Sequence, residues 1–148
     1  MQEDYINIIL ADDDEDDRMF FTDAFEDLKM TTKVQTFNDG VYLMDYLNST
    51  EATLPNVLFL DLNMPRKSGL ECLQEIKQDP KFKDIAIAIY STSASEEDIE
   101  NTFVQGANIY IKKPSSFKKL KKVLSEVVTI NWQYHTNNMN KDNFLLRL

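Results

Sequence analysis

Acidic, hydroxyl and amine side chains follow directly on short apolar segments of this sequence. They are Asp12, Asp13, Asp61, Ser91, Thr92 and Lys113. Carboxylates gathered in one cleft repel one another and raise one another's pKa unless a cation joins them. Mg²⁺ suits such a cleft, because it takes one or two carboxylates and completes its coordination with water and phosphate. We therefore expect a magnesium site that can receive a phosphoryl group.

Asp61 is the expected nucleophile of this group. It ends a continuous apolar run at residues 57–60 and is followed at once by turn residues. Attack by a carboxylate on phosphorus gives an acyl phosphate, and the charge on the transferring oxygens needs cations and donors nearby. Lys113 can supply the cation, and Ser91 or Thr92 the hydroxyl donor. Taken alone, Asp61 could equally cap a strand and Lys113 could be a surface lysine, so the combination carries the prediction.

Strand-like and helix-like segments alternate along the chain, as the positioning of these side chains requires. Apolar or alternating patterns predict strands at residues 5–11, 32–37, 57–60, 85–90 and 107–111. Apolar residues at helical spacing predict helices at about 20–28, 41–47, 70–76, 96–105 and 117–127. This order predicts an α/β fold of (βα)5 type, with a doubly wound parallel five-stranded sheet. Since the carboxyl ends of parallel strands meet at one edge, the six side chains should converge there.

The composition fits one acidic globular domain. The 148 residues are 43% hydrophobic and carry a formal net charge of −9, which disfavours broad nucleic-acid binding. A single cysteine, Cys72, excludes an internal disulfide and a cysteine-rich zinc site and indicates a reducing compartment. No signal peptide is evident, and no apolar stretch approaches the roughly 20 residues that span a bilayer. We expect a soluble, intracellular protein with Cys72 inert and His135 a surface residue.

An unbroken acidic run extends from Asp12 to Asp17. We expect residues 14–17 to be the solvated beginning of a helix, since acids suit the positive end of a helix dipole. Alternate acids in the run superficially resemble a calcium loop. However, Asp17 and Asp23 stand where that loop requires glycine and glutamate, which disfavours a calcium site.

Taken in order along the chain, these segments resemble the receiver domain of two-component response regulators. The matching segments are Ile8-Ile9-Leu10-Ala11-Asp12-Asp13, Leu60-Asp61-Leu62-Asn63-Met64-Pro65, Gly69, Ser91, Gly106-Ala107, Tyr110 and Lys113-Pro114. Each motif alone is weak, whereas together and at compatible spacing they are highly specific, and they cover about residues 4–128. The resemblance implies a flavodoxin-like strand order, 2-1-3-4-5, and a receiver domain at residues 1–128.

The resemblance also implies a role for each side chain of the site. Asp61 would accept a phosphoryl group from a histidine kinase or a phosphotransfer protein. Ser91, with Thr92 beside it as the alternative hydroxyl, would donate a hydrogen bond to that group. Lys113 would pair with the phosphoryl group, and Tyr110 would change rotamer as part of the switch. Mg²⁺ would be held by the carboxylates of Asp12, Asp13 and Asp61 and by the backbone carbonyl of Asn63.

The expected function is that of a stand-alone receiver, a phosphorylation-driven switch and not an enzyme. About twenty residues follow the last expected helix, too few for a DNA-binding domain, so we expect output through protein partners in a bacterial cytoplasm. Residues 79–83 and 91–94 resemble the regulators paired with bacterial phytochromes. Such relatives can dimerise. The tail at residues 129–148 could be an extra helix, an interaction segment or a frayed end, and is a candidate contributor to a homodimer.

Two other functions are alternatives. A phosphatase of the haloacid-dehalogenase type also uses a strand-end aspartate, but it needs a second acid two residues later, where Asn63 stands. A flavin-binding module of the same topology would want a hydroxyl- and glycine-rich loop after the first strand, where the acids of residues 12–17 would repel a phosphate. The sequence therefore favours the receiver over both.

Overall fold

A parallel β-sheet forms the centre of the computed structural model, which describes residues 5–129 and 145–146. Its strands are β1 (Ile6–Ala11), β2 (Thr32–Phe37), β3 (Val57–Leu60), β4 (Ala86–Ser91), β5 (Ile109–Lys112) and β6 (Leu145–Leu146). They lie in the order β2-β1-β3-β4-β5-β6, and every neighbouring pair is parallel. The predicted order 2-1-3-4-5 of the first five strands is therefore confirmed.

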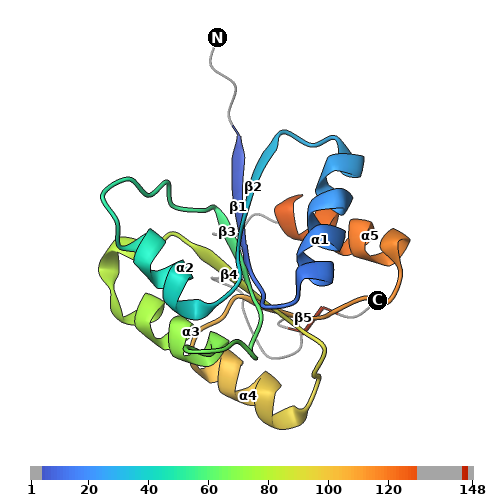
Figure 1. Ribbon diagram of the computed structural model, residues 1–148. Helices are drawn as coiled ribbons and strands as arrows, with labels where there is room; N and C mark the ends of the chain where they lie inside the picture. Colours follow the sequence, from blue (N-terminus) through green and yellow to red (C-terminus); the bar gives the residue numbers. More distant parts are fainter. Residues whose placement is uncertain (1–4, 130–144, 147–148) are drawn as a thin grey trace.

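The described helices cover both faces of this sheet (Figure 1). On one face lie α1 (Glu15–Leu28) and α5 (Phe117–Thr129). On the other lie α2 (Gly40–Leu47), α3 (Gly69–Gln78) and α4 (Glu96–Val104). None of the helices in residues 5–129 is long and apolar enough to cross a membrane. The doubly wound α/β architecture expected from the alternating pattern is confirmed.

Two apolar layers hold the helices against the sheet. On the side of α1 and α5, Phe21 meets Phe59 of β3 and Tyr90 of β4 in edge-to-face contacts, with ring centroids 5.0 and 5.7 Å apart. On the other side, α2 and α3 contribute Leu43 and Leu73, which are fully buried. Because β3 is covered on both faces, its four residues are all apolar and buried. This packing fixes the strand end that carries the predicted nucleophile.

Short polar side chains determine where four helices begin, close to the ends of the strands. The capping residues are Asp14 for α1, Asp39 for α2, Ser68 for α3 and Ser95 for α4. Each accepts a hydrogen bond from a backbone N–H in the first turn of its helix, which satisfies a donor that has no partner inside the helix. Ser68 also forms a reciprocal capping box with Glu71. A glycine follows the end of α4, where Gly106 has a φ of +95°.

The boundary of β5 differs from the sequence prediction, which began this strand at residue 107. The strand begins at Ile109, and at Asn108 the side-chain oxygen is the acceptor for the neighbouring strand. Oδ1 of Asn108 accepts from the Ile87 N–H at 2.8 Å, and the backbone N–H of Asn108 donates to the Ile87 carbonyl at 2.8 Å. At the other end, the pairing continues one residue further than expected, with Ser91 opposite Lys112.

The C-terminal end contains a further short element. Leu145–Leu146 forms the short strand β6 next to β5, with Leu145 opposite Tyr110. A short helix was one of the alternatives for this end, and a sixth strand was not among them. The tail residues Trp132 and His135 lie outside the described residues.

Candidate functional site

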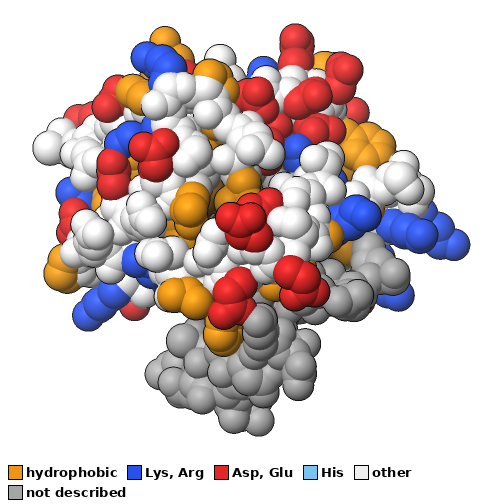
Figure 2. Space-filling view, turned by 90° about the horizontal axis from the view of Figure 1, so that it is seen from below, with side chains coloured by type: hydrophobic (Ala, Val, Ile, Leu, Met, Phe, Trp, Pro, Cys, Tyr) orange, Lys and Arg blue, Asp and Glu red, His pale blue; other side chains and the backbone are white. Residues whose placement is uncertain are grey.

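Side chains from separate strand ends meet at the carboxyl edge of the sheet. Asp12 and Asp13 follow β1, and Asp61 follows β3. Their three carboxylates each offer an oxygen, and these oxygens lie within 4.8 Å of one another. Asp12 and Asp61 are buried, whereas Asp13 is exposed. Figure 2 views the molecule from below, the side to which the strands of Figure 1 run, and shows clusters of acidic side chains on that face. The expected convergence is therefore present for these three acids.

Lys113 lies inside this acidic cluster. Its Nζ is 2.8 Å from Oδ2 of Asp12, 3.4 Å from Oδ2 of Asp61 and 2.7 Å from Oδ2 of Asp17. The Lys113 side chain is 9% exposed, and its Nζ also lies over the ring of Tyr90, 5.4 Å from the centroid. One ammonium group thus balances carboxylates from β1, β3 and α1.

Burial and mutual repulsion disfavour the charged forms of the buried acids in this site. Burial raises the pKa of Asp61 to about 6; the charge of Lys113 opposes this, and that of Asp12 adds to it. Burial likewise raises the pKa of Asp12. Burial lowers the pKa of Lys113, but its ion pairs with Asp12 and Asp17 outweigh burial and the net pKa is raised. The lysine is therefore charged at neutral pH, and one cation faces several acids.

The loop after β3 is held tightly against Asp61. A Cβ added at Gly69 would lie 2.1 Å from the Asp61 carbonyl oxygen, so no other residue fits without a shift of the backbone. The Gly69 N–H donates to the Leu62 carbonyl at 2.9 Å. The Asn63 N–H donates to Oδ1 of Asp61 at 3.4 Å, which leaves Oδ2 facing Lys113. The glycine recognised in the sequence thus determines the position of the nucleophile by close approach.

A further ion pair, which was not predicted from the sequence, anchors the same loop. Arg66 has a φ of 66°, a conformation that residues other than glycine seldom adopt. Its Nη2 and Nε donate to Oδ2 of Asp39 at 2.8 and 3.1 Å, and its guanidinium lies over the Tyr42 ring. Burial opposes the shift, but the Tyr42 N–H and Arg66 together lower the pKa of Asp39. Nothing in the local pattern indicated that residue 66 reaches back to the cap of α2.

Asp17 corrects the prediction for the acidic run. Residues 14–17 were expected to be a solvated beginning of a helix, and this holds for Glu15 and Asp16, which are exposed. Asp17, however, turns inward to Lys113 at 2.7 Å. Asp14 is the cap of α1 and accepts from the Asp17 N–H at 3.2 Å. The spacing of a cap and the third residue of a helix could have indicated that Asp17 lies near the strand ends.

The donor set fits a divalent cation. Within the described residues, Oδ2 of Asp12 is the one buried side-chain nitrogen or oxygen that makes no hydrogen bond, although Lys113 lies at ion-pair distance. A buried carboxylate oxygen left without a hydrogen-bond donor is unfavourable. Beside it are oxygens of Asp13 and Asp61. Hard oxygen ligands in this arrangement are those that Mg²⁺ or a similar ion prefers.

The hydroxyl groups at the end of β4 separate into buried and exposed positions. Ser91, the last residue of this fully buried strand, is buried, whereas Thr92, which follows the strand, is exposed. Oγ of Ser91 accepts from the Ser93 N–H at 3.1 Å. The buried Tyr110 donates from its hydroxyl to the Ser93 carbonyl at 2.7 Å. Burial raises the pKa of Tyr110, and hydrogen bonding to Ser91 and Ser93 opposes this rise. Tyr110 and Ser91 are thus coupled through one short loop.

Cys72 lies apart from this cluster, in α3. It is fully buried, and burial raises the pKa of its thiol to about 12. Its Sγ lies 3.7 Å from the Gly40 carbonyl. The thiol is therefore protonated and shielded, in keeping with the inert role expected for it.

Comparison with known proteins identifies relatives of this arrangement. The sequence matches the response regulator receiver domain family over residues 8–125. It is 33% identical over 128 residues to the probable methanogenesis regulatory protein FilR2 of Methanothrix harundinacea, covering 84% of this chain and 83% of that protein. The crystal structure of the phosphorylated cyanobacterial phytochrome response regulator RcpA has a TM-score of 0.77 at 32% identity, covering 84% of this chain and 91% of that one.

The Mn²⁺-bound form of response regulator Rcp1 has a TM-score of 0.75 at 28% identity, covering 84% of this chain and 92% of that one. These relatives agree with the likeness to phytochrome-associated regulators seen at residues 79–83 and 91–94. The matches give no support to a phosphatase of the haloacid-dehalogenase type. Sequence, fold and site geometry lead to one conclusion: this chain belongs to the response regulator receiver domain family.

Proposed function

We propose that Asp61 accepts a phosphoryl group from a histidine kinase or a phosphotransfer protein. The observation that carries this proposal is the cluster of Asp12, Asp13 and Asp61 around the ammonium of Lys113. An oxygen of Asp61 attacks phosphorus, the bond from phosphorus to the donor nitrogen breaks, and the electron pair stays on that nitrogen. The acyl phosphate on Asp61 is the signalling state. A charge change of this kind at one residue can bias a bistable fold.

Mg²⁺ is the cofactor we propose for this step. Its ligands would be the carboxylates of Asp12, Asp13 and Asp61 and the backbone carbonyl of Asn63. Bound there, the ion supplies positive charge that offsets the repulsion of the acids and of the incoming phosphoryl oxygens. The lone Oδ2 of Asp12 supports this assignment. The Mn²⁺-bound form of the relative Rcp1 supports a divalent cation in general.

Lys113 and Ser91 would stabilise the phosphoryl group from two sides. Lys113 pairs with a phosphoryl oxygen, and the buried Ser91 hydroxyl donates a hydrogen bond to another. Thr92 is the less suitable hydroxyl, since it faces solvent. When Ser91 moves toward Asp61, the Ser93 carbonyl that holds Tyr110 moves with the loop. Tyr110 then changes rotamer and alters the surface formed by α4, β5 and α5.

The output of the switch would be contact with a protein partner. We propose no enzymatic turnover beyond phosphorylation and dephosphorylation of Asp61, and no nucleic-acid partner, given the net charge of −9. The bacterial cytoplasmic setting stays a prediction. We also propose a division into a receiver domain at residues 1–128 and a tail at 129–148 that can contribute to a homodimer. Unchanged solution mass after removal of residues 130–148 would contradict that role of the tail.

Acetyl phosphate and Mg²⁺ provide the test of the phosphoacceptor role. Intact-protein mass spectrometry should show one added phosphoryl group in the wild-type protein and in Asp45→Asn, a control with an exposed acid of α2 replaced. The adduct should be absent in Asp61→Asn and absent when EDTA removes the metal. An adduct that persists in Asp61→Asn would contradict the proposal. Continuous hydrolysis of phosphate esters without an adduct would favour a phosphatase instead.

A further inference from the structure

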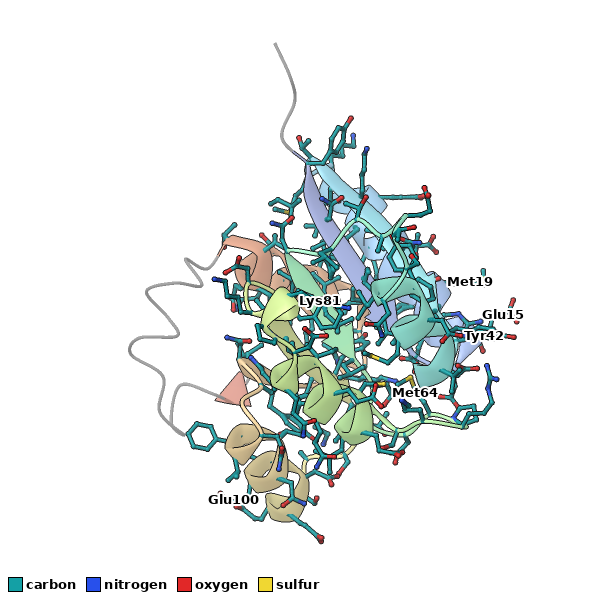
Figure 3. All side chains as sticks on the ribbon, turned by 90° about the vertical axis from the view of Figure 1, so that its left-hand side faces the viewer. Glu15, Met19, Tyr42, Met64, Lys81 and Glu100 are labelled. Atoms are coloured by element: carbon teal, nitrogen blue, oxygen red, sulfur yellow. The ribbon has the colours of Figure 1, made fainter. Side chains whose placement is uncertain are left out.

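Asp17 makes the shortest ion pair with Lys113. Oδ2 of Asp17 lies 2.7 Å from Nζ, compared with 2.8 Å for Asp12 and 3.4 Å for Asp61. The Asp17 contact is also a hydrogen bond. It joins the first turn of α1 to the residue that follows β5. Glu15, two residues earlier, lies at the outer margin of the molecule (Figure 3), so the inward direction of Asp17 is specific to its place on the helix.

The ammonium group of Lys113 already donates hydrogen bonds to Asp17 and Asp61 and lies at ion-pair distance from Asp12. A lysine has three N–H donors and no acceptor, and three carboxylates already surround this one. Of the three, Asp61 is the most distant from Nζ. A phosphoryl group on Asp61 would bring further acceptor oxygens and more negative charge. These oxygens would compete for Lys113 with the carboxylates that now surround it.

Asp17 is the partner that Lys113 can leave most easily. The Asp12 side chain is fully buried, so loss of the lysine would leave its charge without solvent. The Asp17 side chain is 35% exposed, and water can replace the ammonium around its carboxylate. Asp17 is also not among the acids whose oxygens form the candidate metal site.

We propose that Asp17 holds Lys113 back from Asp61 in the unphosphorylated protein, and that the Asp17–Lys113 pair breaks when Asp61 is phosphorylated. This inference rests on the proposed function. Asp17 is a positioning residue in this scheme, because it acts through Lys113 and does not touch the reacting atoms. Its release also frees a contact between α1 and the segment that follows β5. Phosphorylation therefore changes the contacts of the first turn of α1 as well as those of Ser91 and Tyr110.

Binding of beryllofluoride, a mimic of the phosphoryl group on aspartate, tests this scheme. Asp17→Asn removes the ion pair and one negative charge. Asp16→Asn is the matched control, because Asp16 lies in the same helical turn, is exposed and has no ion pair within the described residues. With Mg²⁺ saturating, calorimetric titration should show Asp17→Asn binding beryllofluoride roughly two- to fivefold more tightly than Asp16→Asn, the effect expected from a partly exposed ion pair.

A second background separates an effect through Lys113 from a structural effect. In Lys113→Met, adding Asp17→Asn should change the affinity no more than adding Asp16→Asn does, because no ammonium is left to release. Equal affinities of Asp17→Asn and Asp16→Asn in the otherwise wild-type protein would overturn the proposal. Weaker binding by Asp17→Asn would do so as well, since Asp17 would then assist Lys113. If the wild-type protein itself binds no beryllofluoride, the phosphoacceptor function fails and this inference with it.

Discussion

Removal of the Asp61 charge should make the folded protein more stable at neutral and alkaline pH. Burial raises the pKa of Asp61 from 3.8 to about 6 in the folded chain, so the folded state binds this proton more tightly than the unfolded state does. The resulting stabilisation is fully present below about pH 4 and is lost as the pH rises through about 6. Each pKa unit corresponds to about 1.4 kcal/mol, so the loss amounts to about 3 kcal/mol. Asp61→Asn should therefore gain up to about 3 kcal/mol at pH 8 and almost nothing at pH 4.

Urea unfolding followed by circular dichroism at pH 4, 6 and 8 would measure this difference, with EDTA present to remove metal ions. Asp45→Asn is the control, because it removes an exposed acid of α2 that has no role in the site. Its free energy of unfolding should stay within about 0.5 kcal/mol of the wild type at each pH. If Asp61→Asn is no more stable than the wild type at pH 8, the charge of Asp61 is not destabilising. A gain of the same size at pH 4 and pH 8 would equally refute the assignment to ionisation.

Three other perturbations have expected outcomes. Mg²⁺ at a hundredfold excess over its Kd should raise the free energy of unfolding by about 2.7 kcal/mol. Asp13→Asn should lose most of that gain, and an undiminished gain would exclude Asp13 as a ligand. Gly69→Ala should lower the free energy of unfolding in urea by about 2–3 kcal/mol, because its Cβ would lie 2.1 Å from the Asp61 carbonyl oxygen. Tyr110→Phe removes the 2.7 Å hydrogen bond to the Ser93 carbonyl and should lower the free energy of unfolding by about 1 kcal/mol. An unchanged free energy would mean that water replaces the hydroxyl.

The strand ends could be predicted from the sequence because burial on both faces leaves a local signal. Residues 57–60 are apolar without interruption, and β3 has those bounds in the structure. A charged or hydroxyl side chain just after such a run must lie at the edge of the sheet. This holds for Asp12, Asp61 and Lys113, whose convergence required knowledge only of parallel strand direction. The choice of Ser91 over Thr92 rested on spacing, and the burial of Ser91 agrees with it.

The contacts that could not be predicted from the sequence depend on how helices and loops lie against the sheet. The acidic run near Asp17 is typical of a solvated surface, and only the ion pair with Lys113, after the end of β5, shows that this one carboxylate lies inward. The Arg66–Asp39 pair depends on a left-handed residue inside a turn that has no glycine at that place. The start of β5 differs from the prediction where the side-chain oxygen of Asn108 accepts the Ile87 N–H. Each case is a tertiary contact without a periodic pattern.

The site combines a charge imbalance with contacts that reach several elements, and this combination suits a switch. Lys113 contacts acids from β1, β3 and α1 through its side chain, and its backbone N–H donates to the Ser91 carbonyl at 2.8 Å. A shift of its ammonium toward Asp61 therefore changes the forces on α1 and on the end of β4 together. Tyr110, three residues earlier, pairs through its backbone with β6 and through its hydroxyl with Ser93. One local change in charge at Lys113 would thus act on α1 and on the end of β4, without any need for a continuous path of moving core residues.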